Sequence, residues 1–171
     1  RIFRWVFAPL AILVSVVSGL AVLALAIVAL IFITEPTDTS GSATIAGLAG
    51  TVSVIRDQHS VPHIFADTQH DAYRALGYVH AQDRFFQMEL ARRTAAGRLS
   101  EIIGPLGLRG DRFMRTLGLY RLAEASVATL SPEARAALDA YVEGVNAWLL
   151  DPKTQRPAEL IVLGITPEPW R

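Results

Sequence analysis

The 171-residue sequence contains no cysteine, which excludes a disulfide framework, a thiolate nucleophile and a zinc site with sulfur ligands. It also has no excess of positive charge. Basic and acidic residues number 16 each, and removing Arg1 and Arg4 leaves 14 basic residues against 16 acidic ones. Nucleic-acid binding is therefore excluded, because it requires a basic surface.

A long uncharged run near the N-terminus stands out against these absences. From Val6 to Ile33 there are 28 consecutive residues without a charge, and about 20 suffice to cross a bilayer as a helix. The apolar centre of a secretory signal is only about 7–15 residues long. We therefore expect an uncleaved membrane anchor over residues 1–34, with cleavage in Ala-rich stretches such as residues 24–26 as the alternative.

The charges around this run predict its orientation. Arg1 and Arg4 precede it, whereas Glu35 and Asp38 follow it. Because positive charge is retained on the cytoplasmic side, the rest of the chain is expected on the periplasmic or extracellular side of a single-pass protein of the cell membrane.

Composition divides the remainder into a linker and one incomplete domain. Residues 35–50 are rich in Thr, Ser, Gly, Pro and Ala, which is typical of a linker. Residues 51–171 fall within the size of a single domain. Because the chain starts with Arg1 in place of methionine and stops at Arg171 without a tail, we expect both ends to be cuts through a longer reading frame.

Local signals in the domain predict an α+β fold that is mostly helical. Alternation and β-branched residues predict a β-hairpin, with Pro62 at an edge position. Capping residues and apolar periodicity predict the helices. The expected elements are strands over residues 51–56 and 61–66, a long helix from the Asp67-Thr68 cap to Ala96, a short helix over 99–103, a helix from Asp111 to about Leu130 weakened by Gly118, and a helix from Pro132, capped by Ser131, to Leu150.

Asp83 is the most informative residue of the long helix, because it lies on an apolar stripe. A second apolar line runs along nearly the opposite side of the helix, which predicts packing on both sides. A buried carboxylate needs a partner, since removing one member of a buried pair costs about 3–5 kcal/mol. We expect Asp83 to be largely buried and to pair with Arg112 or Arg115. The stripe comprises Ala72, Leu76, Val79, Phe86 and Leu90, and the second line comprises Tyr78, Ala81, Phe85 and Met88.

Two groups of residues that contain histidine are candidates for a metal or catalytic site. His59 and His63 have the four-residue spacing of a helical metal site, but Pro62 and the strand pattern oppose a helix there, so ordinary hydrogen bonding is favoured for them and for His70. His80, Asp83 and Gln87 would lie close together on one helix, either as a base with its orienting acid or as a structural network. The network is favoured because no nucleophile lies near.

Known catalytic motifs do not appear in these residues. The sequence has no Gly-x-Ser-x-Gly elbow, phosphate loop or dinucleotide fingerprint. Strand, turn and cap chemistry explains the serines beyond the linker, which are Ser53, Ser60, Ser100, Ser126 and Ser131. The residues alone therefore indicate an exported, membrane-anchored, helix-rich segment. A non-enzymatic single-span membrane protein whose helices bind a partner is one interpretation of that segment.

The order of short motifs over residues 51–170 resembles the N-terminal part of the α chain of the penicillin acylase family. The matching pieces are Arg56-Asp57, Val61-Pro62-His63-Ile64, Gly77-Tyr78, Ala81-Gln82-Asp83-Arg84, Phe86-Gln87-Met88-Glu89, Gly97-Arg98 with Glu101 and Gly104, Tyr141 with Gly144-Val145-Asn146-Ala147, and Leu163-Gly164-Ile165-Thr166-Pro167-Glu168-Pro169-Trp170. Their shared order and spacing carry the resemblance.

The resemblance implies an N-terminal-nucleophile hydrolase of the αββα layered fold. Such a precursor cuts itself into α and β chains, frees a serine at the start of the β chain, and hydrolyses a linear amide such as the acyl side chain of a β-lactam, an acyl-homoserine lactone or a related N-acyl amine. It also implies calcium in the full protein. The family's catalytic, substrate-binding and metal residues lie on the β chain or beyond residue 171, so no such residue is assigned here, and the matched positions are interpreted as framework. A long uncleaved anchor departs from the soluble periplasmic members.

Overall fold

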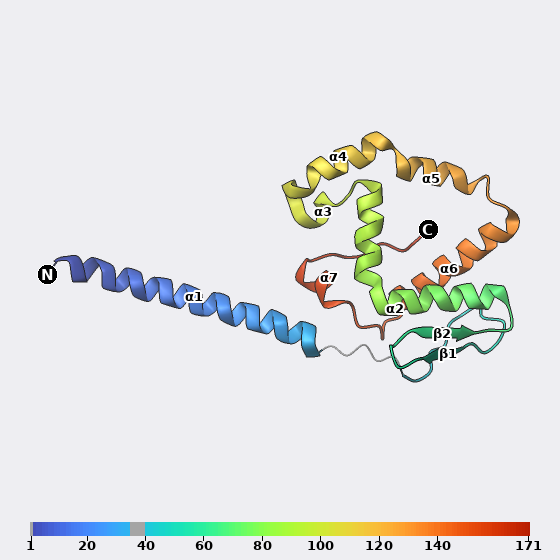
Figure 1. Cartoon of the computed structure of the whole chain (residues 1–171), viewed down its shortest axis with the longest axis horizontal. Coiled ribbons are helices and arrows are strands. Elements are labelled where there is room, and N and C mark those ends of the chain that lie inside the picture. The colour runs from blue at the N-terminus through green and yellow to red at the C-terminus, as the bar shows by residue number, and fades with distance from the viewer. Residues whose placement is uncertain (1, 35–39) are drawn as a thin grey trace. The chain divides into compact units, whose positions relative to one another are not determined.

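The computed structural model describes residues 2–34 and 40–171, and the chain divides into two units, residues 1–38 and 39–171 (Figure 1). The first part of the predicted linker, residues 35–39, lies outside the described residues. So do Arg1, Glu35 and Asp38, three of the four charges on which the predicted orientation depends.

Helix α1, Ile2–Thr34, confirms the helical reading of the uncharged run. Its segment Ile12–Ala29 has a mean hydropathy of 2.8, and none of that segment is buried. A helix of 33 residues is about 50 Å long, and the apolar part of a bilayer is about 30 Å thick. By length and composition, α1 is therefore able to cross a membrane.

The second unit begins with the predicted antiparallel hairpin of β1, Ser53–Arg56, and β2, Pro62–Phe65. The turn between the strands is held by Asp57, whose Oδ1 accepts hydrogen bonds from the backbone N–H groups of His59 (2.8 Å) and Val61 (3.0 Å). Pro62 is the first residue of β2, a position that tolerates the missing N–H.

Helix α2, Gln69–Ala96, has the predicted ends. The Thr68 hydroxyl accepts a hydrogen bond from the Asp71 N–H (3.0 Å), and Gly97 ends the helix in the left-handed conformation with φ of 65°. The Asp71 carboxylate accepts hydrogen bonds from the backbone N–H groups of Ala49 and Gly50. This contact joins the end of the predicted linker to the domain.

The helix breaks at Arg84, where φ is −150° and ψ is 33°, so that α2 bends sharply in the middle (Figure 1). This bend corrects the prediction of one continuous stripe. The buried residues form two lines with four-residue steps, one before the bend (71, 75 and 79) and one that continues across it (77, 81, 85, 89 and 93). Of the nine stripe and line residues only Val79, Ala81 and Phe85 are fully buried, and the rest are half-buried. The buried set is Asp71, Ala75, Gly77, Val79, Ala81, Phe85, Glu89 and Arg93.

The region after α2 contains four short elements where the sequence predicted two helices. They are α3, Ser100–Ile103, the 3-10 helix η1, Gly104–Gly107, α4, Leu108–Leu117, and α5, Leu119–Val127. The prediction of a single helix from Asp111 to Leu130 is wrong. Gly118 adopts a φ of 68° and separates α4 from α5. Only glycine adopts this conformation without strain.

Helix α6, Pro132–Leu150, begins as predicted, with the Ser131 hydroxyl accepting a hydrogen bond from the Ala134 N–H (3.2 Å). It crosses α2 at Gly77 and Gly144. A Cβ at Gly144 would lie closer than 3.0 Å to the Arg74 carbonyl oxygen, and one at Gly77 would lie equally close to that of Tyr141. The backbones of the two helices therefore touch at this crossing.

The core lies where α2, α6 and the last helix α7, Ala158–Val162, meet. Phe85 packs on Trp148 with ring centroids 5.1 Å apart. Leu138, near the start of α6, is exposed. The buried cluster is Ala81, Phe85, Val145, Trp148, Leu160 and Ile165. Contacts of α2 with β2, α4, α5 and α6 confirm that it is covered on more than one side.

Candidate functional site

Asp83 has the basic partner that the sequence required, but the partner is Arg56 of β1 rather than Arg112 or Arg115. The guanidinium donates to both carboxylate oxygens, at 2.7 and 3.0 Å, and also to Gln82 at 3.2 Å. Asp83 is an exposed residue overall, so the prediction that it is largely buried is wrong for the residue as a whole. Its side chain is nevertheless only 20% exposed and that of Arg56 17% exposed, so the ion pair itself is largely shielded. It ties the hairpin to α2 beside the bend.

We expect this pair to contribute measurably to stability. In a double-mutant cycle of Arg56→Gln and Asp83→Asn, the coupling energy should be about 1 kcal/mol, as for a bidentate and largely shielded pair. The same cycle with Arg135→Gln and Asp139→Asn, an exposed pair on α6, should give about 0.3 kcal/mol. Urea unfolding of the full-length protein measures both values, and equal couplings would contradict the role of the Arg56–Asp83 contact.

His80 does not join Asp83 in the predicted network. Its Nδ1 lies 3.1 Å from the Tyr141 hydroxyl of α6, and the two rings meet edge to face. Burial, followed by the charge of Arg84, lowers the pKa of His80, while Asp83 acts in the opposite direction. The neutral imidazole is therefore favoured, and the contact links α2 to α6.

The other histidines form local contacts in the described part of the domain. His63 lies 3.4 Å from Asp57, and His70 lies 3.5 Å from Asp71. Within residues 2–34 and 40–171, no group of three or more His, Asp or Glu side chains is arranged to hold a metal ion.

A chain of alternating charges occupies the second half of α2 and was not predicted. Glu89 has no exposed surface, and its carboxylate accepts hydrogen bonds from Arg92 (2.6 Å) and Arg93 (2.7 Å). Arg93, which is also buried, pairs in turn with Glu101 of α3. Arg98 pairs with the same Glu101 at 2.8 Å. Glu89 and Arg93 continue the buried line of Ala81 and Phe85 along α2, so that these two charges face inward.

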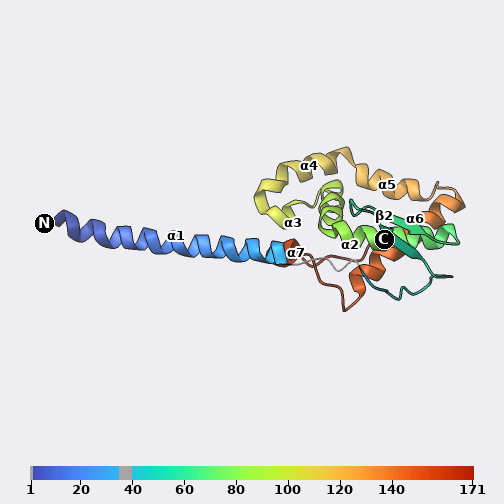
Figure 2. The same ribbon diagram turned by 60° about the horizontal axis from the view of Figure 1, so that its bottom comes forward.

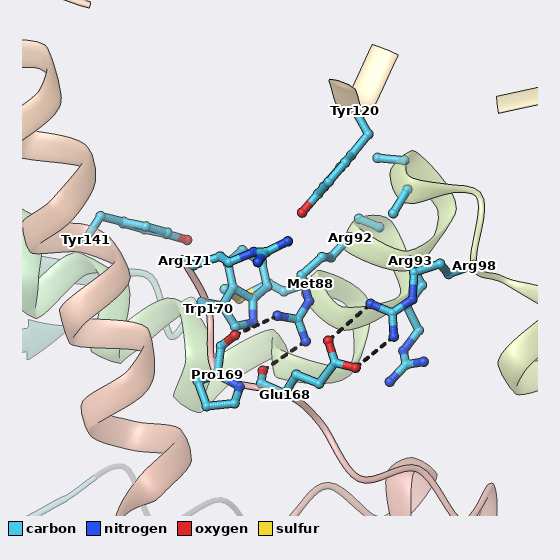
Figure 3. Close-up of a pocket in the computed structure, with 13 residues that line it drawn as sticks. Met88, Arg92, Arg93, Arg98, Tyr120, Tyr141, Glu168, Pro169, Trp170 and Arg171 are labelled. Atoms are coloured by element: carbon cyan, nitrogen blue, oxygen red, sulfur yellow. Dashed lines mark hydrogen bonds and ion pairs between the residues drawn. The ribbon is translucent and has the colours of Figure 1, made fainter. Parts of the chain in front are cut away.

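The chain of charges ends on the segment Glu168–Trp170, which is held by three side chains. Two of them, Arg92 and Arg98, are drawn in Figure 3. Arg98 donates to both carboxylate oxygens of Glu168, at 2.8 and 3.1 Å. Arg92 donates to the carbonyl oxygens of Glu168 (2.9 Å) and Pro169 (3.2 Å), and its guanidinium lies 5.1 Å from the centre of the Trp170 ring. We call Arg92, Arg98 and Asn146 the clasp.

Asn146 of α6 completes the clasp by pairing with the backbone of Trp170 on both sides. Its amide donates to the Trp170 carbonyl oxygen at 2.8 Å, and its Oδ1 accepts from the Trp170 N–H at 2.7 Å. Residues from α2 and α6 thus fix the path of a segment that lies more than 20 positions away in the sequence. A hollow of about 690 Å³ opens beside the clasp, lined by Met88, Tyr120, Tyr141 and Trp170 together with arginines.

The ion pair between Glu168 and Arg98 of the clasp requires an ionised Glu168 carboxyl group. The hydrogen bond from Arg98 lowers the Glu168 pKa from 4.5 to about 2. Because the folded-state pKa is lowered, the contribution of Glu168 to stability is complete above pH 4.5 and is lost as the pH falls toward 2.

We therefore expect Glu168→Gln to flatten the acid dependence of stability. Between pH 4.5 and 2, the urea midpoint of the full-length wild-type protein should fall more steeply than that of Glu168→Gln. Parallel curves would show that Glu168 titrates alike in the folded and unfolded states, contrary to the geometry of the clasp.

The clasp joins motifs that the sequence could identify only separately. Arg98, Glu101, Asn146, Glu168 and Trp170 all belong to the pieces quoted for the family resemblance, and the structure brings them together. The spacing of Glu89, Arg92 and Arg93 is that of i,i+3 and i,i+4 ion pairs. Such pairs are typical of a helix face in contact with water. Nothing local in the sequence indicated that this face is buried.

Comparisons with known proteins identify a matching family and several similar chains. The family model described as penicillin amidase matches residues 51–171. Penicillin acylase 2 proenzyme from Pseudomonas sp. (strain SE83) is 48% identical over 131 residues, which cover 77% of this chain. Acyl-homoserine lactone acylase QuiP from Pseudomonas aeruginosa is 44% identical over 133 residues, which cover 78%. A solved structure, thermostable penicillin G acylase from Alcaligenes faecalis, superposes with a TM-score of 0.62 at 34% identity, covering 70% of this chain and 65% of that one.

These relatives are much longer than the chain described here. The matched region makes up 17% of the Pseudomonas sp. proenzyme and 16% of the P. aeruginosa acylase. The chain therefore spans about one sixth of their length.

Proposed function

The chain belongs to the penicillin amidase family, and from this membership we propose that it is the N-terminal part of an amidohydrolase precursor that hydrolyses a linear amide. The observation that carries the proposal is the match over residues 51–171, with 48% identity to a penicillin acylase proenzyme. The role proposed for this segment is framework, because its motif residues hold helices and backbone together.

The proposed substrates are N-acyl amines, the class that includes the acyl side chains of β-lactams and acyl-homoserine lactones. In the reaction a nucleophilic hydroxyl attacks the amide carbonyl, the C–N bond breaks with transfer of a proton to the leaving amine, and water then releases the acid from the acyl-enzyme. This chemistry requires a nucleophile, a base within hydrogen-bond reach and donors for the oxyanion. The proposal places all three outside residues 1–171.

The activity is tested with the purified full-length protein and a panel of amides. The panel contains phenylacetyl amides, β-lactams with different acyl side chains and acyl-homoserine lactones of several chain lengths, and the readout is release of the free amine. We expect turnover of at least one class. Failure to hydrolyse any of them by a folded, processed protein would contradict the proposed function.

We further propose that the protein is made as a zymogen that cuts itself into an α chain containing residues 51–171 and a β chain beginning with serine. The β chain is then the main partner of this segment. N-terminal sequencing of the purified protein tests this step, because it should reveal a second chain starting with serine. A single uncut chain with full amidase activity would refute it.

Calcium is proposed for the full protein but not for the residues described here. The described residues bring together no group of three or more His, Asp or Glu side chains suited to a cation. We therefore propose that the ion binds outside residues 40–171. Calcium analysis of the purified full-length protein after exhaustive dialysis tests the proposal, and absence of the ion from an active protein would contradict it.

The proposed location is the cell membrane, with α1 as a single span through residues 6–33 and the domain on the outer side. Support comes from the length and apolar composition of α1 and from Arg1 and Arg4 before it. Protease added to intact spheroplasts should then digest the domain. Protection until the inner membrane is lysed would reverse the proposed orientation.

A further inference from the structure

The turn between α3 and α4, residues 103–108, presents apolar side chains to solvent at the outer edge of the second unit (Figures 1 and 2). Leu106 is 87% exposed, which is the largest exposed fraction among the large apolar residues that the structure describes. Ile103 and Leu108 flank it and are 43% and 44% exposed. None of these six residues is charged. We call residues 103–108 the apolar loop.

The apolar loop is held in a fixed shape by contacts at its two ends. The buried Asp111 carboxylate accepts hydrogen bonds from the backbone N–H groups of Leu99 and Ser100, both at 2.8 Å, and so joins the start of α3 to the first turn of α4. Gly107 lies so close to Ser100 that a Cβ there would be 2.7 Å from the Ser100 backbone nitrogen. Because both ends are fixed, little freedom remains for Leu106 to turn back onto the domain.

Positive charge without a carboxylate partner accompanies the apolar loop. Arg109 and Arg112 follow it on the first two turns of α4, both are exposed, and neither forms an ion pair within the described residues. The acidic residues nearest in the sequence are engaged elsewhere, because Glu101 pairs with Arg98 and Asp111 binds the backbone. The surroundings of the loop are therefore basic.

A lipid surface fits this combination of features better than a protein surface does. A stable protein interface takes about 20–30 residues from each partner, whereas the apolar loop offers three large apolar side chains. A bilayer requires no complementary shape, because apolar side chains enter the acyl region while basic ones stay at the head groups. Burial of one leucine favours the bound state about tenfold or more, and one arginine near an anionic surface favours it about fivefold.

Helix α1 makes such a small contact effective. It is long and apolar enough to hold the chain in a membrane. A few favourable side chains bind a soluble protein only weakly, but a tether makes the second contact intramolecular and raises its effective concentration. A loop of this size therefore orients a tethered domain and does not need to anchor it.

We propose that the apolar loop is a membrane-docking surface, in which Ile103 and Leu106 insert between lipids and the two arginines bind the phosphate groups of anionic head groups. The inference rests on the proposed location of the protein in the cell membrane. It goes beyond that location because it gives the domain itself, and not only α1, a contact with lipid. The edge of the domain formed by α3 and the start of α4 then faces the bilayer.

Photo-crosslinking in the full-length protein tests this assignment. Leu106 is replaced by p-benzoylphenylalanine, and Leu150, an exposed leucine at the end of α6, is replaced in the same way as the matched control. The proteins are reconstituted in vesicles of phosphatidylcholine with about 30% phosphatidylglycerol as the anionic lipid. After irradiation, mass spectrometry measures attached phospholipid. We expect the phospholipid yield at position 106 to be at least about fivefold that at position 150.

The basic residues are tested by combining Arg109→Gln with Arg112→Gln, and Arg135→Gln on α6 is the control for loss of an exposed arginine. The double substitution should lower the phospholipid yield at position 106 about fivefold or more, and so should omission of phosphatidylglycerol. Arg135→Gln should leave the yield unchanged. A yield that depends neither on the two arginines nor on anionic lipid would contradict the proposed binding of head groups.

Other crosslinks would also overturn the proposal. Attachment of position 106 to a peptide of the same polypeptide would show that protein covers the loop, a species of twice the mass would identify a second copy, and equal phospholipid yields at positions 106 and 150 would indicate random collision. Sedimentation with the vesicles is measured in parallel. A protein that sediments but gives no phospholipid adduct at position 106 refutes the docking and leaves the proposed location intact, whereas a protein that does not sediment refutes both.

Discussion

Gly144→Ala is expected to destabilise the domain by about 3 kcal/mol or more, because the added methyl group would collide with the Arg74 carbonyl oxygen at the crossing of α2 and α6. Both atoms in the collision are fixed by the two helix backbones, so no flexible side chain can move away. Separating the helices would also loosen the packing of Phe85 on Trp148. Gly77→Ala should act similarly, since its methyl group would meet the Tyr141 carbonyl oxygen from the other helix.

Gly110→Ala provides the matched control for these substitutions. Gly110 lies inside α4, and a Cβ there would meet nothing within 4 Å. Alanine is favoured over glycine in a helix interior by about 0.5–1 kcal/mol. The urea midpoint of the full-length protein should therefore stay equal or rise for Gly110→Ala and fall sharply for Gly144→Ala. A small change at Gly144 would contradict the close approach of the two helices.

Glu89→Gln is expected to produce the second large loss, of about 3–5 kcal/mol. The substitution keeps the shape of the side chain but removes the charge that Arg92 and Arg93 face. Arg93 is itself buried, so it would retain a positive charge with only Glu101 to compensate. Breaking a buried ion pair is costly because the remaining charge has lost its hydration as well as its partner.

Asp139→Asn is the control for the loss of one carboxylate from an i,i+4 pair with arginine. The Arg135–Asp139 pair has the same spacing as Glu89–Arg93, but both of its side chains are about half exposed. Its loss should cost no more than about 0.5 kcal/mol. Thermal or urea unfolding of the full-length variants compares the two. Similar small effects would show that water reaches the Glu89 cluster and that the charges are not buried in solution.

Local signals predicted the ends of the elements well, because caps and turns are decided by neighbouring residues. Thr68 and Ser131 begin α2 and α6, and Gly97 ends α2, as their hydrogen-bonding and backbone preferences require. Gly118 was recognised as a weak point, but its effect was underestimated. A glycine within a helical pattern can be tolerated or can break the helix, and tertiary packing decides between these outcomes.

For interactions between distant residues, the sequence predicted the type of contact but not the partner residue. The need of Asp83 for a basic partner followed from its place on the apolar stripe. The choice of Arg56 depends on how the hairpin lies against α2, which no local pattern specifies. The break at Arg84 has no proline or glycine to indicate it, and no local pattern predicts the contact of His80 with Tyr141 or the burial of Glu89 and Arg93. These contacts form only after the chain has packed.

The family resemblance identified residues of the clasp that the hydrophobic periodicity of the sequence could not identify. Asn146, Glu168 and Trp170 looked unrelated in the sequence, because their contacts span more than 20 positions. Only the order of motifs shared with the family grouped these residues. The structure shows why they belong together, because they form the contacts that hold the segment Glu168–Trp170. The membrane role of α1 remains a proposal that its length and composition support.

We propose that this segment belongs to the framework of an amidohydrolase and that the rest of the precursor carries the chemistry. The most direct test measures amine release from the preferred N-acyl amine by full-length wild type, His80→Ala and Asp83→Asn, each normalised to the amount of folded, processed protein. We expect kcat per folded molecule to change less than about threefold, since neither side chain is proposed to touch the reacting atoms. A loss of about 100-fold or more with folding and processing intact, the size expected for a lost general base, would contradict it and move the catalytic site into residues 51–171.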